Sequence, residues 1–201
     1  MQNHNEWLRD IPSDIGNYIA GFVDGEGSFN ISLRRREDHR LGWDIDPSFN
    51  VSQRDRVILA FLKKTFGCGT LRERKDGVVY FEVRNLAMLH QRVIPFFERF
   101  GFWSAAKKRN FAIFKRIISI LCQGPLSQEI LEQVVHLRET LNEGRGRKRK
   151  YEEHHVLNGK SSETLRQTHL HSNTGKEDHE MIKSDLIGDY EPRNQPRTNN
   201  G

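Results

Sequence analysis

The sequence has little of what disulfide-bonded, zinc-binding and membrane proteins require. It holds two cysteines in 201 residues, Cys68 and Cys122, and neither belongs to a C-x-x-C pair, which excludes a disulfide framework and a cysteine-based zinc site. No stretch approaches the ~20 apolar residues of a membrane span. The first ten residues, "MQNHNEWLRD", lack the charged and apolar blocks of a secretion signal. We therefore expect an intracellular protein with reduced thiols and no membrane partner.

Hydrophobic residues become scarce toward the C-terminus. Only 10 of the 58 residues between Gly144 and Gly201 are hydrophobic, against 35% of the whole chain, and so polar a stretch buries too little apolar surface to pack. We expect one folded domain over residues 1–143 and a tail over residues 144–201, first basic and then polar, that is largely disordered. No function is assigned to this tail.

Positive charge is concentrated in short runs. The formal net charge is +5, and the runs "LRRREDHR", "AAKKRNF" and "GRGRKRKY" suit a polyanion better than a small acid. The alternative is a solvated surface, because charge runs are common on ordinary protein exteriors. The charge pattern alone leaves nucleic-acid binding and this alternative equally open.

The spacing of apolar residues switches between helical and strand periods along the chain. A helix is predicted from Ile15, with Asp14 as its N-cap and Gly25 and Gly27 at its end. The remaining predicted elements are strands at 28–34, 44–52, 70–74 and 78–84, and helices at 55–66, 86–97, 105–121 and 127–141. The order αββαββα, with terminal helices, predicts an α+β fold: a four-stranded antiparallel sheet with helices on one face.

The other face of that sheet is predicted to be open and polar. Alternation places on it Asn30, Ser32, Arg34, Arg36, Asp46, Ser48, Asn50, Arg72, Arg74, Tyr80 and Glu82. Arginine and asparagine have the bidentate geometry that reads base edges, which favours DNA binding over a merely solvated face. The tip of the first hairpin, including Arg40, should reach the outer bases or phosphates.

Two acids end the first predicted helix. Asp24 and Glu26 lie at the negative end of the helix dipole, where anions are disfavoured, so a cation is expected nearby. Carboxylate and carbonyl oxygens select magnesium-like ions. The small residues Ala20 and Gly21, one turn earlier, would let the same helix of a second subunit approach and pair two Glu26 side chains. The alternative is an ordinary C-cap turn with a surface Glu26.

The segment "IAGFVDGEG", residues 19–27, resembles the LAGLIDADG signature of the homing endonucleases. Further segments, "GSFNISL", "DPSFNVSQRD", "VIPFFERFGF", "KKRNFAIFK" and "LRETLNEGRGRKRKY", resemble the single-motif members encoded in group I introns, so the similarity covers roughly residues 15–151. The chain has one copy of the motif, and the single-motif members are homodimers. The resemblance implies an αββαββα saddle over double-stranded DNA, with two motif helices side by side at its centre.

The resemblance also implies a role for individual residues. Glu26 takes the position of the metal-binding acid, which is usually aspartate in the family, and the Gly25 carbonyl is a lesser metal ligand. Gln53 takes the position of the residue that orders water at the scissile phosphate, and Lys107 that of the basic residue. The implied metal is Mg²⁺, with Mn²⁺ as a substitute, and the implied dimer interface contains Ala20, Gly21 and Asp24.

The function implied is that of a site-specific homing endonuclease, which makes a metal-dependent double-strand cut in a long pseudopalindromic DNA target and so promotes intron homing. The implied location is intracellular, either the cytoplasm of a bacterium or archaeon or an organelle. Two alternatives stay open: an RNA maturase that binds intron RNA and assists splicing, and a catalytically inactive DNA-binding regulator. Glu26, Gln53 and Lys107 together argue against the regulator but not against the maturase.

Overall fold

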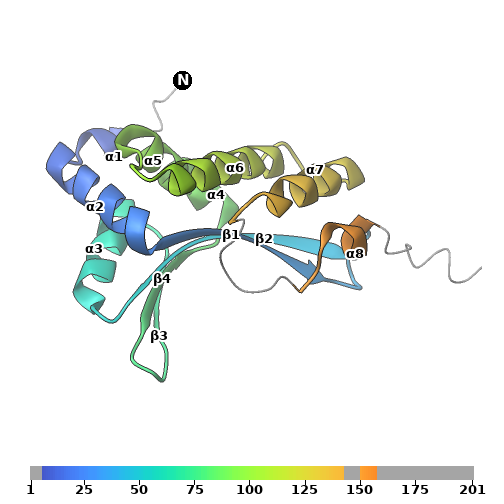
Figure 1. Cartoon of the computed structure of the whole chain (residues 1–201), viewed down its shortest axis with the longest axis horizontal. Helices are drawn as coiled ribbons and strands as arrows, with labels where there is room; N and C mark the ends of the chain where they lie inside the picture. Colours follow the sequence, from blue (N-terminus) through green and yellow to red (C-terminus); the bar gives the residue numbers. More distant parts are fainter. Residues whose placement is uncertain (1–5, 143–149, 158–201) are drawn as a thin grey trace, which may run out of the picture.

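The computed structural model describes residues 6–142 and 150–157 (Figure 1). Two short terminal helices, α1 (Glu6–Arg9) and α8 (Glu153–Leu157), flank the main body. That body consists of α2 (Ser13–Glu26), β1 (Gly27–Arg35), β2 (Trp43–Gln53), α3 (Arg56–Phe66), β3 (Thr70–Glu73), β4 (Val79–Val83), α4 (Leu86–Met88), the π-helix η1 (Leu89–Val93), α5 (Ile94–Phe100), α6 (Ala105–Leu121) and α7 (Gln128–Glu139).

The four strands form one antiparallel sheet in the order β1-β2-β4-β3. Gly27 pairs with Val51, Phe49 with Val83, and Leu71 with Phe81. Helices α5, α6 and α7 lie along one side of the β1–β2 hairpin (Figure 1). The predicted α+β class and its four-stranded antiparallel sheet are therefore confirmed.

Aromatic packing between the sheet and the helices forms the core. Phe29 and Phe49 stack across β1 and β2 with ring centroids 5.3 Å apart, and Phe97 from α5 meets both rings edge-on. Phe66 of α3 and Phe114 of α6 close the cluster, and all five side chains are buried. Because odd-numbered residues of β1 supply this core, its even-numbered residues are left for the opposite face.

Helix α2 differs from its predicted start and end. It begins at Ser13 after Pro12 with no side-chain cap, so the prediction that Asp14 is the N-cap is wrong: Asp14 lies in the first turn, past the cap position. The helix continues through Glu26, and the Gly27 N–H closes it on the carbonyl of Val23. Both acids therefore belong to its last turn.

The predicted helix over residues 86–97 has three parts instead of one. Residues Leu86–Met88 are α-helical, Leu89–Val93 form a π-turn, and the α-helix resumes at Ile94. Pro95 has no N–H and its ring crowds the preceding turn, and a wider turn before it accommodates both effects. The π-turn still points Leu89 and Val93 into the core.

A packed segment lies beyond the predicted domain boundary at residue 143. Val156 of α8 is buried against Trp43 of β2 and Val135 of α7. Buried Arg138 donates to the carbonyl oxygens of Ile31 (3.1 Å) and Tyr151 (2.9 Å), which ties this segment to the sheet. The rest of the predicted tail lies outside the described residues. Within the described parts of the chain, no helix is long and apolar enough to cross a bilayer.

Candidate catalytic centre and nucleic-acid interface

The acidic end of α2 meets the N-terminus of α6. The Asp24 carboxylate accepts hydrogen bonds from the backbone N–H groups of Trp103 and Ser104, each at 2.9 Å, and from the Ser104 hydroxyl at 2.5 Å. Ser104 is the N-cap of α6 and accepts in turn from the N–H of Lys107. The negative end of one helix dipole, with its acids, therefore faces the positive end of another.

These contacts decide the protonation of Asp24. Partial burial alone raises the pKa of this carboxyl group, but the hydrogen bonds from Ser104 and Trp103, together with the charge of Lys107, outweigh burial. The net result is a pKa below the ordinary aspartate value. Asp24 is therefore an ionised structural acceptor that joins α2 to α6.

Lys107 brings a positive charge to the same point. Its Nζ donates to the carbonyl oxygen of Gly27, the residue directly after the two acids. Burial of this half-buried side chain lowers its pKa, and the nearby carboxylates of Asp24 and Glu26 partly offset that effect. The structure thus brings Lys107 and Glu26, two of the three predicted catalytic residues, within electrostatic reach of each other.

Gln53, the third predicted catalytic residue, lies at the end of β2. Gly27 pairs with Val51, so Gln53 lies two residues beyond the point where β1 begins. Its side-chain oxygen accepts the N–H of Arg54 at 2.8 Å. The Gln53 side chain forms no hydrogen bond with Glu26 or Lys107.

Glu26 and Gly25 are both exposed at the end of α2. An exposed carboxylate beside backbone carbonyls is a hard oxygen donor set, which fits Mg²⁺ or Mn²⁺ but not a thiophilic metal. The one group of three potential metal ligands among the described residues is elsewhere, at Glu152, His154 and His155. His154 and His155 of this exposed group belong to α8, which lies far from the end of α2 (Figure 1). The group therefore does not contribute to the candidate centre at Glu26.

The predicted DNA-binding residues divide into two groups. Even-numbered residues of β1 and β2 share the open face with residues of β3 and β4, and the register aligns Ser52 with Tyr80 and Tyr80 with Arg72. The residues that occupy this face are Asn30, Ser32, Arg34, Asp46, Asn50, Arg72, Tyr80 and Glu82. Ser48 points the same way but is only 8% exposed, which leaves little of it for a ligand.

The other predicted contacts lie in turns. Arg36 and Arg40 belong to the turn between β1 and β2, and the Arg36 guanidinium binds both oxygens of Asp38 at 2.8 and 2.7 Å. Arg74 follows the end of β3, donates to the Tyr80 hydroxyl at 2.7 Å, and lies 3.1 Å from Asp76. Arg36 and Arg74 therefore form ion pairs or hydrogen bonds within the protein before any ligand arrives.

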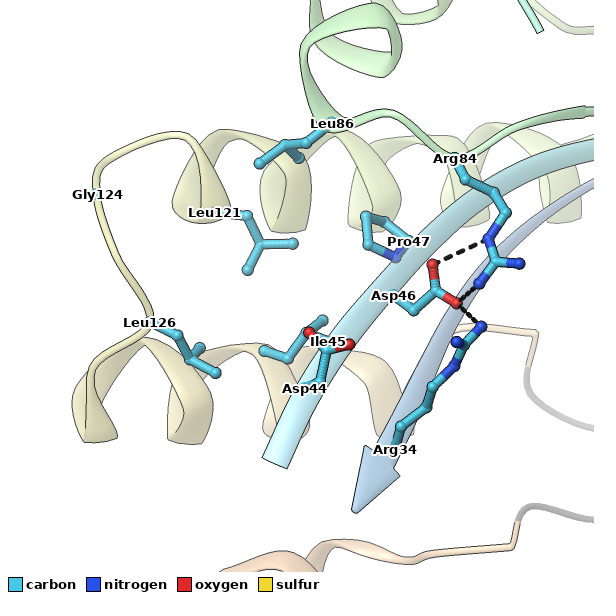
Figure 2. A pocket seen from close by; sticks show the side chains of 10 residues that line it. All are labelled: Arg34, Asp44, Ile45, Asp46, Pro47, Arg84, Leu86, Leu121, Gly124 and Leu126. Carbon is cyan, nitrogen blue, oxygen red and sulfur yellow. Dashed lines mark hydrogen bonds and ion pairs between the residues drawn. The ribbon is translucent and has the colours of Figure 1, made fainter. Parts of the chain in front are cut away.

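One cluster on the open face was not anticipated. Asp46 of β2 lies between Arg34 of β1 and Arg84, the residue after β4, and accepts hydrogen bonds from both guanidinium groups (Figure 2). Arg84 follows Tyr80 and Glu82 in alternation and so belongs to the same side of the sheet, but it is not among the predicted DNA-binding residues. A cleft of about 410 Å³ opens beside this cluster, with Leu86 and Leu121 on its other wall.

The residues of α2 that were predicted to form a dimer interface differ in their exposure. Ala20 is only 3% exposed and its side chain packs in the core of its own protomer, so it offers little surface to the predicted dimer interface. Gly21 and Gly25 are exposed, with no atom within 4 Å of where a Cβ would lie, and Tyr18 is 58% exposed on the same helix. Asp24 is turned toward α6.

Comparison with known proteins gives concordant results. The family model described as LAGLIDADG endonuclease matches residues 19–118. The homing endonuclease I-ApeII of Aeropyrum pernix is 32% identical over 106 residues, which cover 52% of this chain and 62% of that protein. DNA endonuclease I-CeuI of Chlamydomonas moewusii is 29% identical over 132 residues, 63% of this chain and 60% of that one. The chain thus spans about three fifths of each of these two relatives.

One solved structure is matched over most of its length. The archaeal intron-encoded homing endonuclease I-Vdi141I, complexed with DNA, superposes with a TM-score of 0.66 at 31% identity, over 71% of this chain and 92% of that one. This chain has a four-stranded antiparallel sheet with an open polar face, and beside it a helix that ends in two acids. Together with the matches above, these features assign the chain to a class of DNA endonucleases. The chain belongs to the LAGLIDADG endonuclease family.

Proposed function

We propose that this protein is a site-specific homing endonuclease that cuts both strands of a long, nearly palindromic DNA target. The observation that carries the proposal is the junction of α2 and α6, where Glu26 is exposed within electrostatic reach of Lys107 and beside the open sheet face. A DNA-binding protein without cleavage would not need an exposed acid at the point where polyanionic DNA approaches, because that acid repels phosphate.

The chemistry proposed is hydrolysis of a phosphodiester. A divalent cation, Mg²⁺ or Mn²⁺, when bound at Glu26 and the Gly25 carbonyl, supplies charge stabilisation to the phosphate oxygens. Lys107 offsets negative charge that develops on the phosphate, and Gln53 holds water in position. To hold water, the Gln53 side-chain amide must exchange its hydrogen bond with the Arg54 N–H for one with solvent.

The active form proposed is a homodimer. One carboxylate per protomer is a small ligand set for a nuclease metal site, and a twofold axis beside the end of α2 would bring two Glu26 side chains together. The exposed stripe of Tyr18, Gly21 and Gly25 supports this arrangement, because glycines without neighbours let a second helix come close. Asp24, already bonded to α6, supports the interface indirectly by fixing the end of α2.

The ligand proposed is duplex DNA, read by the open face in the major groove. Each protomer would contact one half of the target, so the whole site would span around two turns at ~10.5 bp per turn. Arg72 and Tyr80 on the face, and Arg36 and Arg40 at the hairpin tip, are proposed as inner and outer contacts. I-Vdi141I, the solved relative with 31% identity, is a complex with DNA, which supports this assignment.

The second candidate is an RNA maturase that binds the folded intron. The same basic open face favours it, since phosphate contacts do not distinguish DNA from RNA. The exposed acid beside Lys107 has no part in that function. The two activities can also coexist in one protein.

Cleavage of a reconstructed target tests the proposal. The duplex is made by joining the sequences that flank the intron of this reading frame, and it is incubated with protein and Mg²⁺, Mn²⁺, Ca²⁺ or EDTA. The proposal expects double-strand cleavage at one site with Mg²⁺ and with Mn²⁺, and none with EDTA. A protein that binds the folded intron RNA but leaves this duplex intact in Mg²⁺ would be a maturase instead.

A further inference from the structure

We propose that Asp46 is a positioning residue that holds Arg34 and Arg84 as a fixed pair on the open face, and that this pair reads guanine in each half of the target. The inference rests on the proposed function and extends it to a chemical specificity. It also assigns a role in recognition to Arg84, which lies one residue beyond the end of β4.

The geometry of the cluster defines the pair. Asp46 lies on the inner strand β2, opposite Ser32, so Arg34 of β1 and Arg84 after β4 approach it from the two neighbouring strands. Oδ1 of Asp46 accepts from Arg84 Nε at 3.1 Å, while Oδ2 accepts from the Nη2 atoms of both Arg84 and Arg34. Figure 2 shows the carboxylate held between the two guanidinium groups.

Exposure indicates which groups are left for a ligand. The Asp46 side chain is 16% exposed, whereas those of Arg34 and Arg84 are 52% and 38% exposed. Both carboxylate oxygens are engaged, which argues against a direct contact from Asp46 to a cytosine amino group. Each guanidinium has about five N–H donors, and the Asp46 bonds use two from Arg84 and one from Arg34.

Those remaining donors match guanine best. Guanine presents two acceptors, O6 and N7, in the major groove, and a bidentate arginine is their usual partner. An exposed arginine on a flexible stem loses conformational freedom when it makes such a contact. By holding the two guanidinium planes beforehand, Asp46 reduces that loss for the correct base, which sharpens discrimination.

This role predicts a combination of effects that a purely structural acid would not produce. Asp46 is an anion on a face that meets phosphates, so its removal should strengthen binding to DNA of any sequence. Its removal should also free the two arginines and weaken base discrimination. Both guanidinium partners of Asp46 are partly exposed to water, and ion pairs near the surface contribute little to folding stability, so the fold should persist without this carboxylate.

The test compares Asp46→Asn with Glu98→Gln. Glu98 of α5 pairs with Lys115 of α6 at 2.8 Å in the helical layer, so its variant removes the same charge from an ion pair away from the open face. Binding to the reconstructed duplex and to its single-base-pair variants is measured in Ca²⁺ at several salt concentrations. Thermal melting of each protein verifies folding.

For Asp46→Asn we expect discrimination at one or two G·C positions of each half-site to fall about tenfold, while affinity for unrelated DNA rises. Glu98→Gln should leave the base profile unchanged. Arg84→Lys, which keeps the charge but loses the planar fork, should lose preference at one of the same positions. The double variant should lose no more there than Arg84→Lys alone, since both changes act on one contact.

The outcomes separate this inference from the proposed function. An unchanged base profile in Asp46→Asn, or an Arg84→Lys effect at different positions, overturns the inference while wild-type cleavage of the target stands. Failure of the wild type to bind the target removes both. Should Asp46→Asn melt too low for binding measurements, Arg84→Lys decides: lost guanine preference supports the inference and an unchanged profile overturns it.

Discussion

Removal of the Asp24 carboxylate should destabilise the protein although the group lies partly at the surface. Asp24 accepts three hydrogen bonds at the start of α6: two from backbone N–H groups and one from the Ser104 hydroxyl. Asp24→Ala leaves all three donors without this partner. The substitution also removes the Asp24 bonds between the last turn of α2 and the start of α6, the junction at which the candidate catalytic centre lies.

The expected cost follows from those three bonds. Hydrogen bonds to a charged group contribute about 1.5 to 3 kcal/mol, whereas the N-cap of α6, Ser104, is still present in this variant. Water can reach this site and replace part of the loss, so we expect about 2 kcal/mol in total. With a urea m-value of ~2 kcal/mol/M, the unfolding midpoint should fall by about 1 M.

Asp14→Ala provides the matched control. Asp14 is an exposed acid at the other end of the same helix, and no side-chain cap forms there. Its removal should change the free energy of unfolding by no more than about 0.5 kcal/mol. Urea unfolding of both variants is followed at one fixed protein concentration, because the proposed dimerisation would make stability depend on concentration. Equal midpoints for Asp24→Ala and the wild type would refute the account of the junction.

The pH dependence gives a second check on Asp24. Its pKa is lowered in the folded protein, so its stabilising effect is present above the ordinary aspartate pKa of about 3.9 and is lost as pH falls through the lowered folded value. The stability difference between wild type and Asp24→Ala should therefore be constant near neutral pH and shrink below about pH 4. A difference that grows on acidification contradicts the assigned sign.

Four further predictions concern other residues. Gly16→Ala should cost about 1 to 3 kcal/mol in unfolding free energy by overpacking, because its Cβ would lie 2.2 Å from the Phe100 ring. Gly21→Leu should leave the stability of the monomer unchanged but weaken the proposed dimer, as measured by sedimentation. Burial lowers the pKa of Lys107, so as the pH rises the cleavage rate should begin to fall at a pH below the ordinary lysine pKa. Lys107→Arg should shift this fall to higher pH, because arginine keeps its charge. Arg72→Ala should change base preference at one position by roughly 1 to 3 kcal/mol in a site-saturation cleavage assay; an unchanged preference removes Arg72 from the readout.

Local sequence patterns were enough to predict the sheet and most helices. Phe29 and Ile31 alternate with Asn30 and Ser32, and this period of two fixes both the strand and its polar face. The helix predicted over residues 105–121 has the same bounds in the structure, where the Ser104 side chain caps its start. The helix over 86–97 was mispredicted in detail, since the effect of Pro95 depends on how the preceding turn widens.

Contacts between distant segments could not be read from the sequence. The sequence predicted a cation near Asp24 and Glu26, and the structure shows that part of the positive charge comes from the N-terminus of α6, about eighty residues later. Ala20 was assigned to a dimer interface by its size alone, whereas burial depends on which side of α2 faces α5. The Asp46 cluster draws on three separate segments, so no local pattern revealed it.

The central claim is that Glu26 is the metal-binding acid of a DNA-cutting centre. Its most direct test is cleavage and binding of the reconstructed target by Glu26→Gln, beside Asp14→Asn, which removes the same charge from the opposite end of α2. The account predicts that Glu26→Gln binds the target as tightly as the wild type or more tightly but does not cut it in Mg²⁺, while Asp14→Asn cuts normally. Cleavage by Glu26→Gln at the wild-type rate would contradict the claim.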